Sequence, residues 1–310
     1  MPPPQSRANF RESPEREVRV YGVLRSWLSP KLALSEVGSL RSWLRGSSGS
    51  IMLVVEGDIP LTLKRKSLSL TSSRKGVQIN PQQIARVFGV LYLITFITSI
   101  PAFFVFYAPV LNDPRYVVGA GADNSVALGA LLELILIIAN IGTAVVLYPI
   151  LKRQNEILIL GYVTARVMEC VFIAVGLLSL LTIVTLRQEA TAGADAASLV
   201  TVGKSLVALH DWTFLLGPGF MVGVGNGLIL GYLMYTSALV PRGMAVLGLI
   251  GGTLIIASGV GVLFGVIEAG GAVQGIATIP EALWELSLGI WPIVRGFNPS
   301  AIARLEHESA

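Results

Sequence analysis

Charged residues are scarce in this sequence. They make up 14 % of its 310 residues, whereas about 25 % is usual for a soluble domain. Hydrophobic residues make up 53 %, and the mean hydropathy is +0.70. This composition excludes an ordinary soluble globular domain and predicts a protein with several membrane-spanning helices.

Cysteine and histidine are also rare, with one cysteine, Cys170, and two histidines. A lone cysteine excludes an intrachain disulfide, and these residues give no cluster of the kind that marks a zinc site. The sequence lacks the HExxH, GxSxG and P-loop motifs, and the glycine-rich stretch 223–227 lies in an apolar run where a phosphate would not reach. We therefore expect no metal, no cofactor and no enzyme activity.

The first 80 residues differ from the rest in charge. They carry 13 Lys and Arg against 6 Asp and Glu, whereas residues 81–310 carry 10 against 13. No apolar run in this segment is long enough to span a membrane. We expect a disordered basic tail, an anchor on the membrane surface, or an over-extended gene start. A basic cluster at 64–66, close to the first span, favours lipid headgroups over nucleic acid as its partner.

Between residues 81 and 298, long apolar segments alternate with short polar joints. This pattern predicts an all-α fold, a polytopic transmembrane helix bundle, because each segment reaches the about 20 residues needed to cross the hydrocarbon core. The six predicted spans are 84–108, 126–151, 157–186, 206–238, 243–267 and 276–294. A short cytoplasmic tail, 299–310, follows them.

The fourth span is too long for one crossing. We expect Pro218 to break it, because proline lacks a backbone N–H and clashes with the preceding turn. The membrane-crossing part would then run from Pro218 to about Ser237. His210 and Asp211 would lie in a preceding interfacial segment, as a hydrogen-bonded pair or, alternatively, as an acid/base couple of an intramembrane enzyme.

Positive residues are divided unevenly between the two sides of the predicted bundle. With a cytoplasmic N-terminus, eight lie inside and three outside. The inside residues are Arg74, Lys75, Arg86, Lys152, Arg153, Arg242, Arg295 and Arg304, and the outside residues are Arg115, Arg187 and Lys204. Because Lys and Arg concentrate in cytoplasmic loops, we expect both termini in the cytoplasm.

Four glycines recur at four-residue intervals in the fourth span, at Gly219, Gly223, Gly227 and Gly231. On a helix they share one face and leave a groove in which another helix can approach closely. We interpret this face as a packing seam, with a pore or substrate groove as the alternative. The helix that fills it can belong to this chain, to a second copy or to another membrane protein.

Several polar residues lie inside the predicted spans, where a charge costs at least about 2.5–3.5 kcal/mol. Arg166 and Glu169 are three residues apart on one helix face and can bond to each other. Glu133 and Asn140 share a face of the second span. For both pairs, a packing contact between helices is the alternative to a functional site.

The sixth predicted span adds Glu281 and Glu285. We expect Glu281 to begin a helix beside Pro280, and Glu285 to lie deeper. Arg166 is the only positive residue among these intramembrane groups, so at least one of the four carboxylates should be protonated, water-exposed or ligand-bound. The candidate polar site consists of Arg166, Glu169, Glu133, Asn140 and Glu285.

Four motifs together carry a resemblance to a known family. They are Ala85-Arg86-x-x-Gly89-x-Leu91-Tyr92-Leu93, Ala165-Arg166-x-x-Glu169, Ser237-x-Leu239-Val240-Pro241-Arg242 before Gly248, and Pro280-x-x-x-x-Glu285-x-x-Leu288-Gly289-x-Trp291-x-x-x-Arg295-Gly296-Phe297. Over about residues 82–300 the chain resembles bacterial membrane proteins grouped as domain of unknown function family 4386. The resemblance implies a six-span protein of the bacterial inner membrane and no particular activity. The first 80 residues have no counterpart in it.

Two function classes lead at this point, and an intramembrane enzyme that uses His210, Asp211 and the carboxylates is the third alternative. The first is transport or sensing of a small solute or of protons through the intramembrane polar site. The second is a non-catalytic membrane partner or scaffold, whose glycine faces pack against a second copy or another membrane protein. The lipid bilayer is the expected surrounding in both, and nucleic acid is not an expected partner.

Overall fold

The computed structural model describes residues 80–119, 121–190 and 195–308. These residues belong to one compact unit, Arg74–Ala310. The expected basic segment lies outside the described residues, apart from Asn80. Every regular element in the described part of the chain is a helix, so the predicted all-helical class is confirmed.

The helices follow one another with short connections. In chain order they are α3 (Pro81–Pro101), η1 (Ala102–Phe106), α4 (Ala108–Asn112), η2 (Tyr116–Val118), α5 (Asp123–Leu151), α6 (Glu156–Glu189), α7 (Ala196–Phe214), η3 (Leu215–Met221), η4 (Gly223–Leu230), α8 (Gly231–Ser237), α9 (Arg242–Leu263), α10 (Ala272–Val294) and α11 (Pro299–Glu308). The elements η1, η3 and η4 are π-helices, and η2 is a 3₁₀-helix.

Five helical segments of the described chain are long and apolar enough to cross a membrane. They are Pro81–Phe106, Asp123–Leu151, Glu156–Glu189, Ala196–Ser237 and Arg242–Leu263. They correspond to the first five predicted spans. The sixth predicted span forms helix α10, which is not among the five, and its glutamates and Gln274 lower its apolar character.

The expected break at Pro218 is wrong. The chain is helical without interruption from Ala196 to Ser237, over 42 residues, and Pro218 lies inside the π-helix η3. Hydrogen bonds in a π-helix join residues five apart, and the wider turn accommodates a proline that would clash with the carbonyl four residues earlier. His210 is therefore part of the same long helix and not of a separate interfacial segment.

Local sequence signals explain where several helices begin and end. The side chains of Asn80 and Asn155 cap α3 and α6 by accepting hydrogen bonds from the backbone N–H groups of Gln82 and Leu158. Such caps satisfy N–H groups that have no partner within the helix. At the end of α8, Ala238 takes a left-handed conformation with φ of 55°, which turns the chain towards α9.

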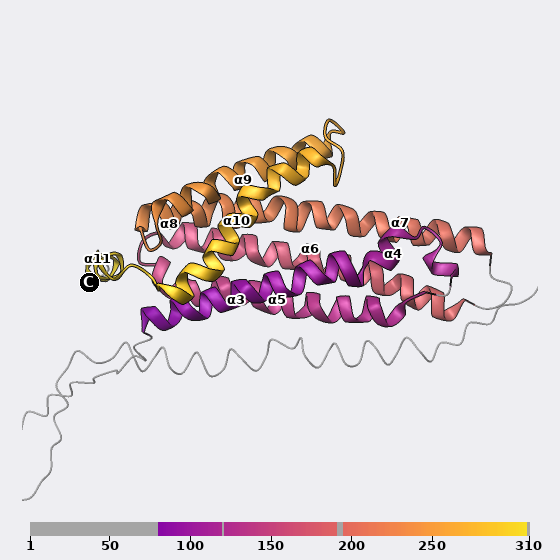
Figure 1. Cartoon of the computed structure of the whole chain (residues 1–310), viewed down its shortest axis with the longest axis horizontal. Coiled ribbons are helices and arrows are strands. Elements are labelled where there is room, and N and C mark those ends of the chain that lie inside the picture. The colour runs from indigo at the N-terminus through magenta and orange to yellow at the C-terminus, as the bar shows by residue number, and fades with distance from the viewer. Residues whose placement is uncertain (1–79, 120, 191–194, 309–310) are drawn as a thin grey trace, which may run out of the picture. The chain divides into compact units, whose positions relative to one another are not determined.

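The long helices close into a ring in chain order. Helix α3 packs against α5, α5 against α6, α6 against α7, η3 and η4, η4 against α9, α9 against α10, and α10 against α3. Figure 1 shows α3, α5, α6 and α7 running lengthwise beside one another, with α9 and α10 as a hairpin and α10 crossing towards α3. A ring of this kind places one face of every member towards a common centre.

Two apolar clusters close the ring at its ends. One joins the start of α3, the end of α5 and the end of α10, and it includes Phe88, Leu147 and Leu288. The expected tail also belongs here, because Leu305 of α11 is buried in this cluster. The other cluster, around Val126, joins η1, η2, α5 and α6. The region between the two clusters contains the polar residues.

Candidate functional site: a polar cavity inside the helix ring

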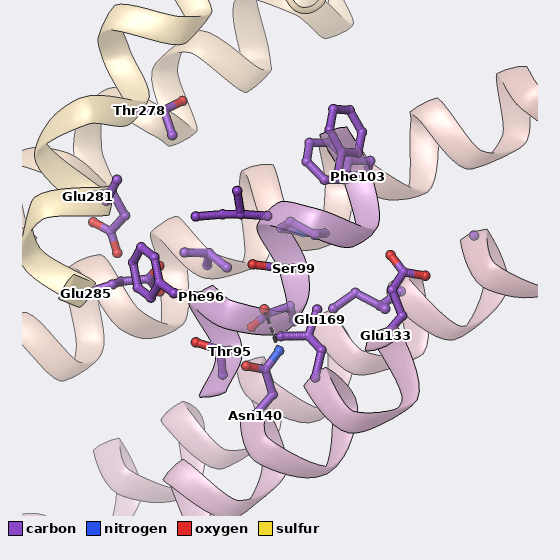
Figure 2. Close-up of a pocket in the computed structure, with 18 of the residues that line it drawn as sticks. Thr95, Phe96, Ser99, Phe103, Glu133, Asn140, Glu169, Thr278, Glu281 and Glu285 are labelled. Atoms are coloured by element: carbon purple, nitrogen blue, oxygen red, sulfur yellow. Dashed lines mark hydrogen bonds between the residues drawn. The ribbon is translucent and has the colours of Figure 1, made fainter. Parts of the chain in front are cut away.

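A cavity of about 240 Å³ lies at the centre of the ring and is lined by residues from every long helical segment. The polar residues that line it are Thr95, Ser99, Glu133, Asn140, Arg166, Glu169, His210, Thr213, Thr278, Glu281 and Glu285. All five members of the predicted polar site are among them. In Figure 2, Glu281 and Glu285 lie on α10 on one side, and Glu133, Asn140 and Glu169 lie on the side of α5 and α6.

Arg166, Glu169 and Asn140 form a closed hydrogen-bonded triangle. Arg166 Nη1 donates to Glu169 Oε2 at 2.7 Å, and Arg166 Nη2 donates to Asn140 Oδ1 at 2.6 Å. Asn140 Nδ2 in turn donates to the second carboxylate oxygen of Glu169 at 3.0 Å. The amide of α5 therefore bridges the two charges of α6, which fixes how these helices pack.

The guanidinium group of Arg166 is held on a third side by an aromatic ring. Its central carbon lies 5.6 Å from the centre of the Tyr92 ring on α3, within the range of a cation–π interaction. Arg166 is 2 % exposed, and its Nε has no hydrogen-bond partner. The positive charge of Arg166 is thus largely matched by Glu169, which leaves the other carboxyl groups of the cavity without a cationic partner of their own.

Glu133 lies apart from this triangle, although it shares a helix with Asn140. It accepts a hydrogen bond of 2.9 Å from the hydroxyl of Tyr107. Tyr107 is fully buried and follows the π-helix η1. The predicted pair of Glu133 and Asn140 thus contributes to one cavity through two separate sets of contacts.

The expectation that Glu281 begins a helix is wrong. Helix α10 begins at Ala272 and continues through Pro280. Glu281 is 1 % exposed, and neither of its carboxyl oxygens has a hydrogen-bond partner within the described part of the chain. Glu281 is therefore a central residue of the site, although the sequence pattern had indicated a position at a helix end.

Glu285 lies one turn further along α10 and contacts the π-helix η4. It accepts a hydrogen bond from the side-chain N–H of Asn226. The backbone carbonyl of Asn226 accepts one from Trp284 Nε1 at 3.0 Å, while its side-chain oxygen has no partner. Asn226 was missed in the sequence analysis, although an amide in the middle of an apolar glycine-rich run was a visible signal.

The glycine face of the fourth segment packs against α9 of the same chain. A Cβ atom at Gly223 would lie 2.5 Å from a side-chain carbon of Ile255, and one at Gly231 would lie 3.3 Å from the backbone of Leu249. The fourth glycine, Gly219, has only atoms of its own segment nearby. Three of the four glycines thus line the interhelical contact.

One glycine from each of these two helices makes room for Glu281. A Cβ atom at Gly227 would lie 2.8 Å from Glu281 Oε2, and one at Gly251 of α9 would lie 2.7 Å from it. Backbone of η4 and α9 therefore closes around this carboxyl group without donating a hydrogen bond to it.

His210 and Asp211 make the expected hydrogen-bond contact but differ in exposure. His210 is 3 % exposed and lies among the rings of Phe103, Tyr107 and Phe214, whereas the side chain of Asp211 is 64 % exposed. Their closest approach, from Nδ1 to Oδ1, is 3.4 Å. Only His210 lines the central cavity.

Comparison with known proteins identifies a family. The model of the family described as Domain of unknown function (DUF4386) matches residues 87–296. This chain belongs to that family. The matched region contains all the residues that line the cavity, so the cavity is built wholly within the family's domain. Comparisons with curated proteins and with solved structures found no match.

Proposed function

We propose that the chain is a six-span protein of the bacterial inner membrane that binds a small solute in the central cavity in exchange for protons, for transport or sensing. The observation that carries this proposal is Glu281, a buried carboxyl group on the cavity wall whose two oxygens have no partner among the described residues. Buried polar groups in proteins are nearly always satisfied. A buried carboxyl group that lines a cavity and has no partner is suited to a ligand or a proton.

The closed ring supports a sixth span. Helix α10 packs against both α3 and α9, which are two of the five segments that can cross a membrane. Its 23 residues are enough to cross about 30 Å of hydrocarbon. Its glutamates face the cavity, as ionisable residues in membrane helices usually do. The distribution of Lys and Arg favours cytoplasmic termini.

The balance of charge supports a link to protons. Arg166 pairs with Glu169 at 2.7 Å, whereas Glu133, Glu281 and Glu285 have neutral partners or none. Burying an ionised carboxylate without a cation is costly. Each of these carboxyl groups is neutralised either by a proton or by a cationic group of a ligand. Exchange of the proton for the ligand would link ligand binding to proton release.

Transport can be tested with the full-length chain in proteoliposomes. A panel of cationic, neutral and anionic small solutes would be screened for saturable uptake that depends on a pH gradient. We expect Glu281→Gln to abolish the uptake. Glu268→Gln is the matched control, because Glu268 is exposed in the connection between α9 and α10.

Two results would contradict the proposal. One is that no solute of the panel is taken up or binds to the purified chain. The other is that Glu281→Gln and Glu268→Gln behave alike. Saturable binding without uptake that is lost in Glu281→Gln would favour sensing over transport.

We propose no enzymatic role for His210 and Asp211. The Asp211 side chain is mostly exposed and does not line the cavity, and the imidazole is surrounded mainly by aromatic rings. An acid/base couple requires both groups within reach of one reacting atom. Hydrolysis abolished by His210→Ala would contradict this part of the proposal.

A partner or scaffold role through glycine faces is the second candidate. A glycine that still offers an open face is Gly275 near the start of α10, where a Cβ atom would have nothing within 4 Å. A second copy or another membrane protein could pack there. A stoichiometric partner lost in Gly275→Leu but kept in Glu281→Gln would favour this candidate over solute binding.

A further inference from the structure

The surroundings of Glu281 restrict what can bind to it. On the helix side it is enclosed by the backbone at Gly227 and Gly251, which donates no hydrogen bond to it. A hydrogen-bond donor for Glu281 must therefore come from the cavity. Asn226 contributes a third unpartnered acceptor, its Oδ1, in the adjoining helix η4. The partner that Glu281 and Asn226 lack is therefore a hydrogen-bond donor.

The charges of the cavity favour a cation. Glu133, Glu281 and Glu285 remain after Arg166 and Glu169 neutralise each other. Arg166 Nε is a buried donor without a partner among the described residues, and it belongs to a charge that is already matched. An anion would therefore meet three carboxyl groups and one neutralised guanidinium.

Part of the cavity lining is apolar and aromatic. It is formed by Phe96, Ile100 and Phe103, with the Phe103 ring stacked on Phe214 at a distance of 4.5 Å between centres. In the view of Figure 2 the ring of Phe96 lies beside Glu285, and Phe103 lies further along the cavity. Such a wall suits the apolar body of a ligand and interacts favourably with a nearby cation.

The cavity reaches the outer surface of the ring along an apolar edge. Phe104 and Ile100 both line it, and they are 70 % and 49 % exposed. A ligand with an apolar body can therefore enter from the lipid side. The volume of about 240 Å³ is slightly below the about 300–1,000 Å³ of typical small-molecule sites, which limits the ligand to a small molecule.

A bare metal ion fits these surroundings less well. Calcium takes six to eight oxygen ligands, and magnesium keeps a near-octahedral shell. Within the described residues, no group of three or more His, Cys, Asp or Glu side chains is arranged to hold a metal. The apolar wall would also leave one side of an ion without ligands.

We infer that the cavity binds a small organic cation, an ammonium group carried on an apolar or aromatic body, with Glu281 as its anchor. This inference rests on the proposed function and specifies its substrate class. In the empty cavity Glu281 holds a proton. On binding, the O–H bond of its carboxyl group breaks, the proton leaves to water, and the carboxylate accepts a hydrogen bond from the ammonium group. One proton is released for each cation bound.

This exchange makes binding weaker at low pH, because protons then compete for Glu281. The other titratable groups on the cavity wall are Glu285 on α10, Arg166 and Glu169 on α6, Glu133 on α5 and His210 on α7. The lining residues from α3, η1, η3 and α9 carry no titratable group. Loss of proton release in Glu281→Gln would therefore identify Glu281, and not one of these neighbours, as the source of the proton.

Three probes of nearly the same shape test the inference by calorimetry on the purified full-length chain. They are 2-phenylethylammonium, neutral 2-phenylethanol and anionic 3-phenylpropanoate. We expect the ammonium ion to bind at least about tenfold more tightly than the other two, because among the three probes it alone can donate a charge-assisted hydrogen bond to the Glu281 carboxylate. Glu281→Gln should remove this preference, and Glu268→Gln should keep it.

The wild-type chain alone also tests the inference, in case Glu281→Gln does not fold. Titration in two buffers with different heats of protonation measures the protons released, and we expect a value near one. Tighter or equal binding of the alcohol or the propanoate would overturn the cationic class while leaving solute binding intact. Binding of the ammonium ion without proton release would overturn the exchange at Glu281, and no binding of any probe would overturn the inference. The wider solute panel decides the proposed function separately.

Discussion

Gly227 of η4 lies directly against Gly252 of α9, so that a Cβ atom at Gly227 would stand 2.3 Å from the Cα atom of Gly252. Gly252 has the reciprocal relationship, with the Cα atom of Gly227 at 2.7 Å from its own ideal Cβ position. The two backbones touch without intervening side chains. This contact closes the ring next to Glu281.

We expect Gly227→Ala to destabilise the protein by about 1–3 kcal/mol, because the added methyl group overpacks this contact. Gly243→Ala is the matched control, since a Cβ atom there would meet nothing within 4 Å. It should leave stability unchanged or raise it by up to about 1 kcal/mol. Unfolding of the purified chain in detergent measures both. Equal stability of the two variants would contradict the close contact.

The buried triangle around Arg166 should behave as a structural unit. We expect Arg166→Gln and Glu169→Gln each to lower the free energy of unfolding by about 3–5 kcal/mol, because each leaves an uncompensated buried charge. The double variant should lose less than the sum, with a coupling of at least about 0.5 kcal/mol. Thermal and denaturant unfolding of the four proteins give this cycle.

The exposed pair of Arg153 and Glu306 provides the control for that cycle. Its side chains are 37 % and 52 % exposed, so Arg153→Gln should change stability by no more than about 1 kcal/mol. If the buried single variants are as stable as the wild type, the triangle is not structural. Its charges would then be retained at a cost to stability, as functional residues often are.

Tyr116 makes stability depend on pH in the alkaline range. Burial, followed by the hydrogen bond that its hydroxyl donates to Asp123 at 3.1 Å, raises the pKa of Tyr116 to about 12. The unfolded side chain has a pKa of about 10. Between these values the unfolded state loses the proton and the folded state keeps it, so folding stability falls as pH rises.

The measurement is the stability of the wild type and Tyr116→Phe between about pH 9 and pH 12. The wild type should lose more stability than the variant above about pH 10, because phenylalanine cannot titrate. Tyr235→Phe, at an exposed tyrosine, should follow the wild-type curve. Parallel curves for the wild type and Tyr116→Phe would show that the raised pKa is wrong.

Trp284 links α10 to the π-helix η4. It is fully buried and donates a hydrogen bond of 3.0 Å to the carbonyl of Asn226. We expect Trp284→Phe to cost about 1–3 kcal/mol, because it leaves a gap and removes that bond. Trp291→Phe, at a partly buried position of the same helix, should cost less. Similar losses in both variants would contradict a special role for the bond to Asn226.

Local features of the sequence predicted much of the fold. Long apolar segments separated by polar joints located most of the helices to within a few residues, because hydrocarbon requires backbone groups to be satisfied within each helix. The fourth was the exception, since it begins at Ala196 and not at residue 206. The three-residue spacing of Arg166 and Glu169 predicted their bond for the same reason, since it depends on a single helix. The glycine spacing indicated a close-packing face without identifying the helix that fills it.

The tertiary structure alone decided which helices meet. Asn140 reaches Arg166 from another helix, and Glu281 lies in the ring centre instead of at a helix end. The continuous helix through Pro218 depends on wide π-turns that residue-by-residue preferences do not predict. Such contacts depend on how each helix is rotated and placed against partners distant in the chain. Composition and periodicity thus determined the helices, and packing between them determined the cavity.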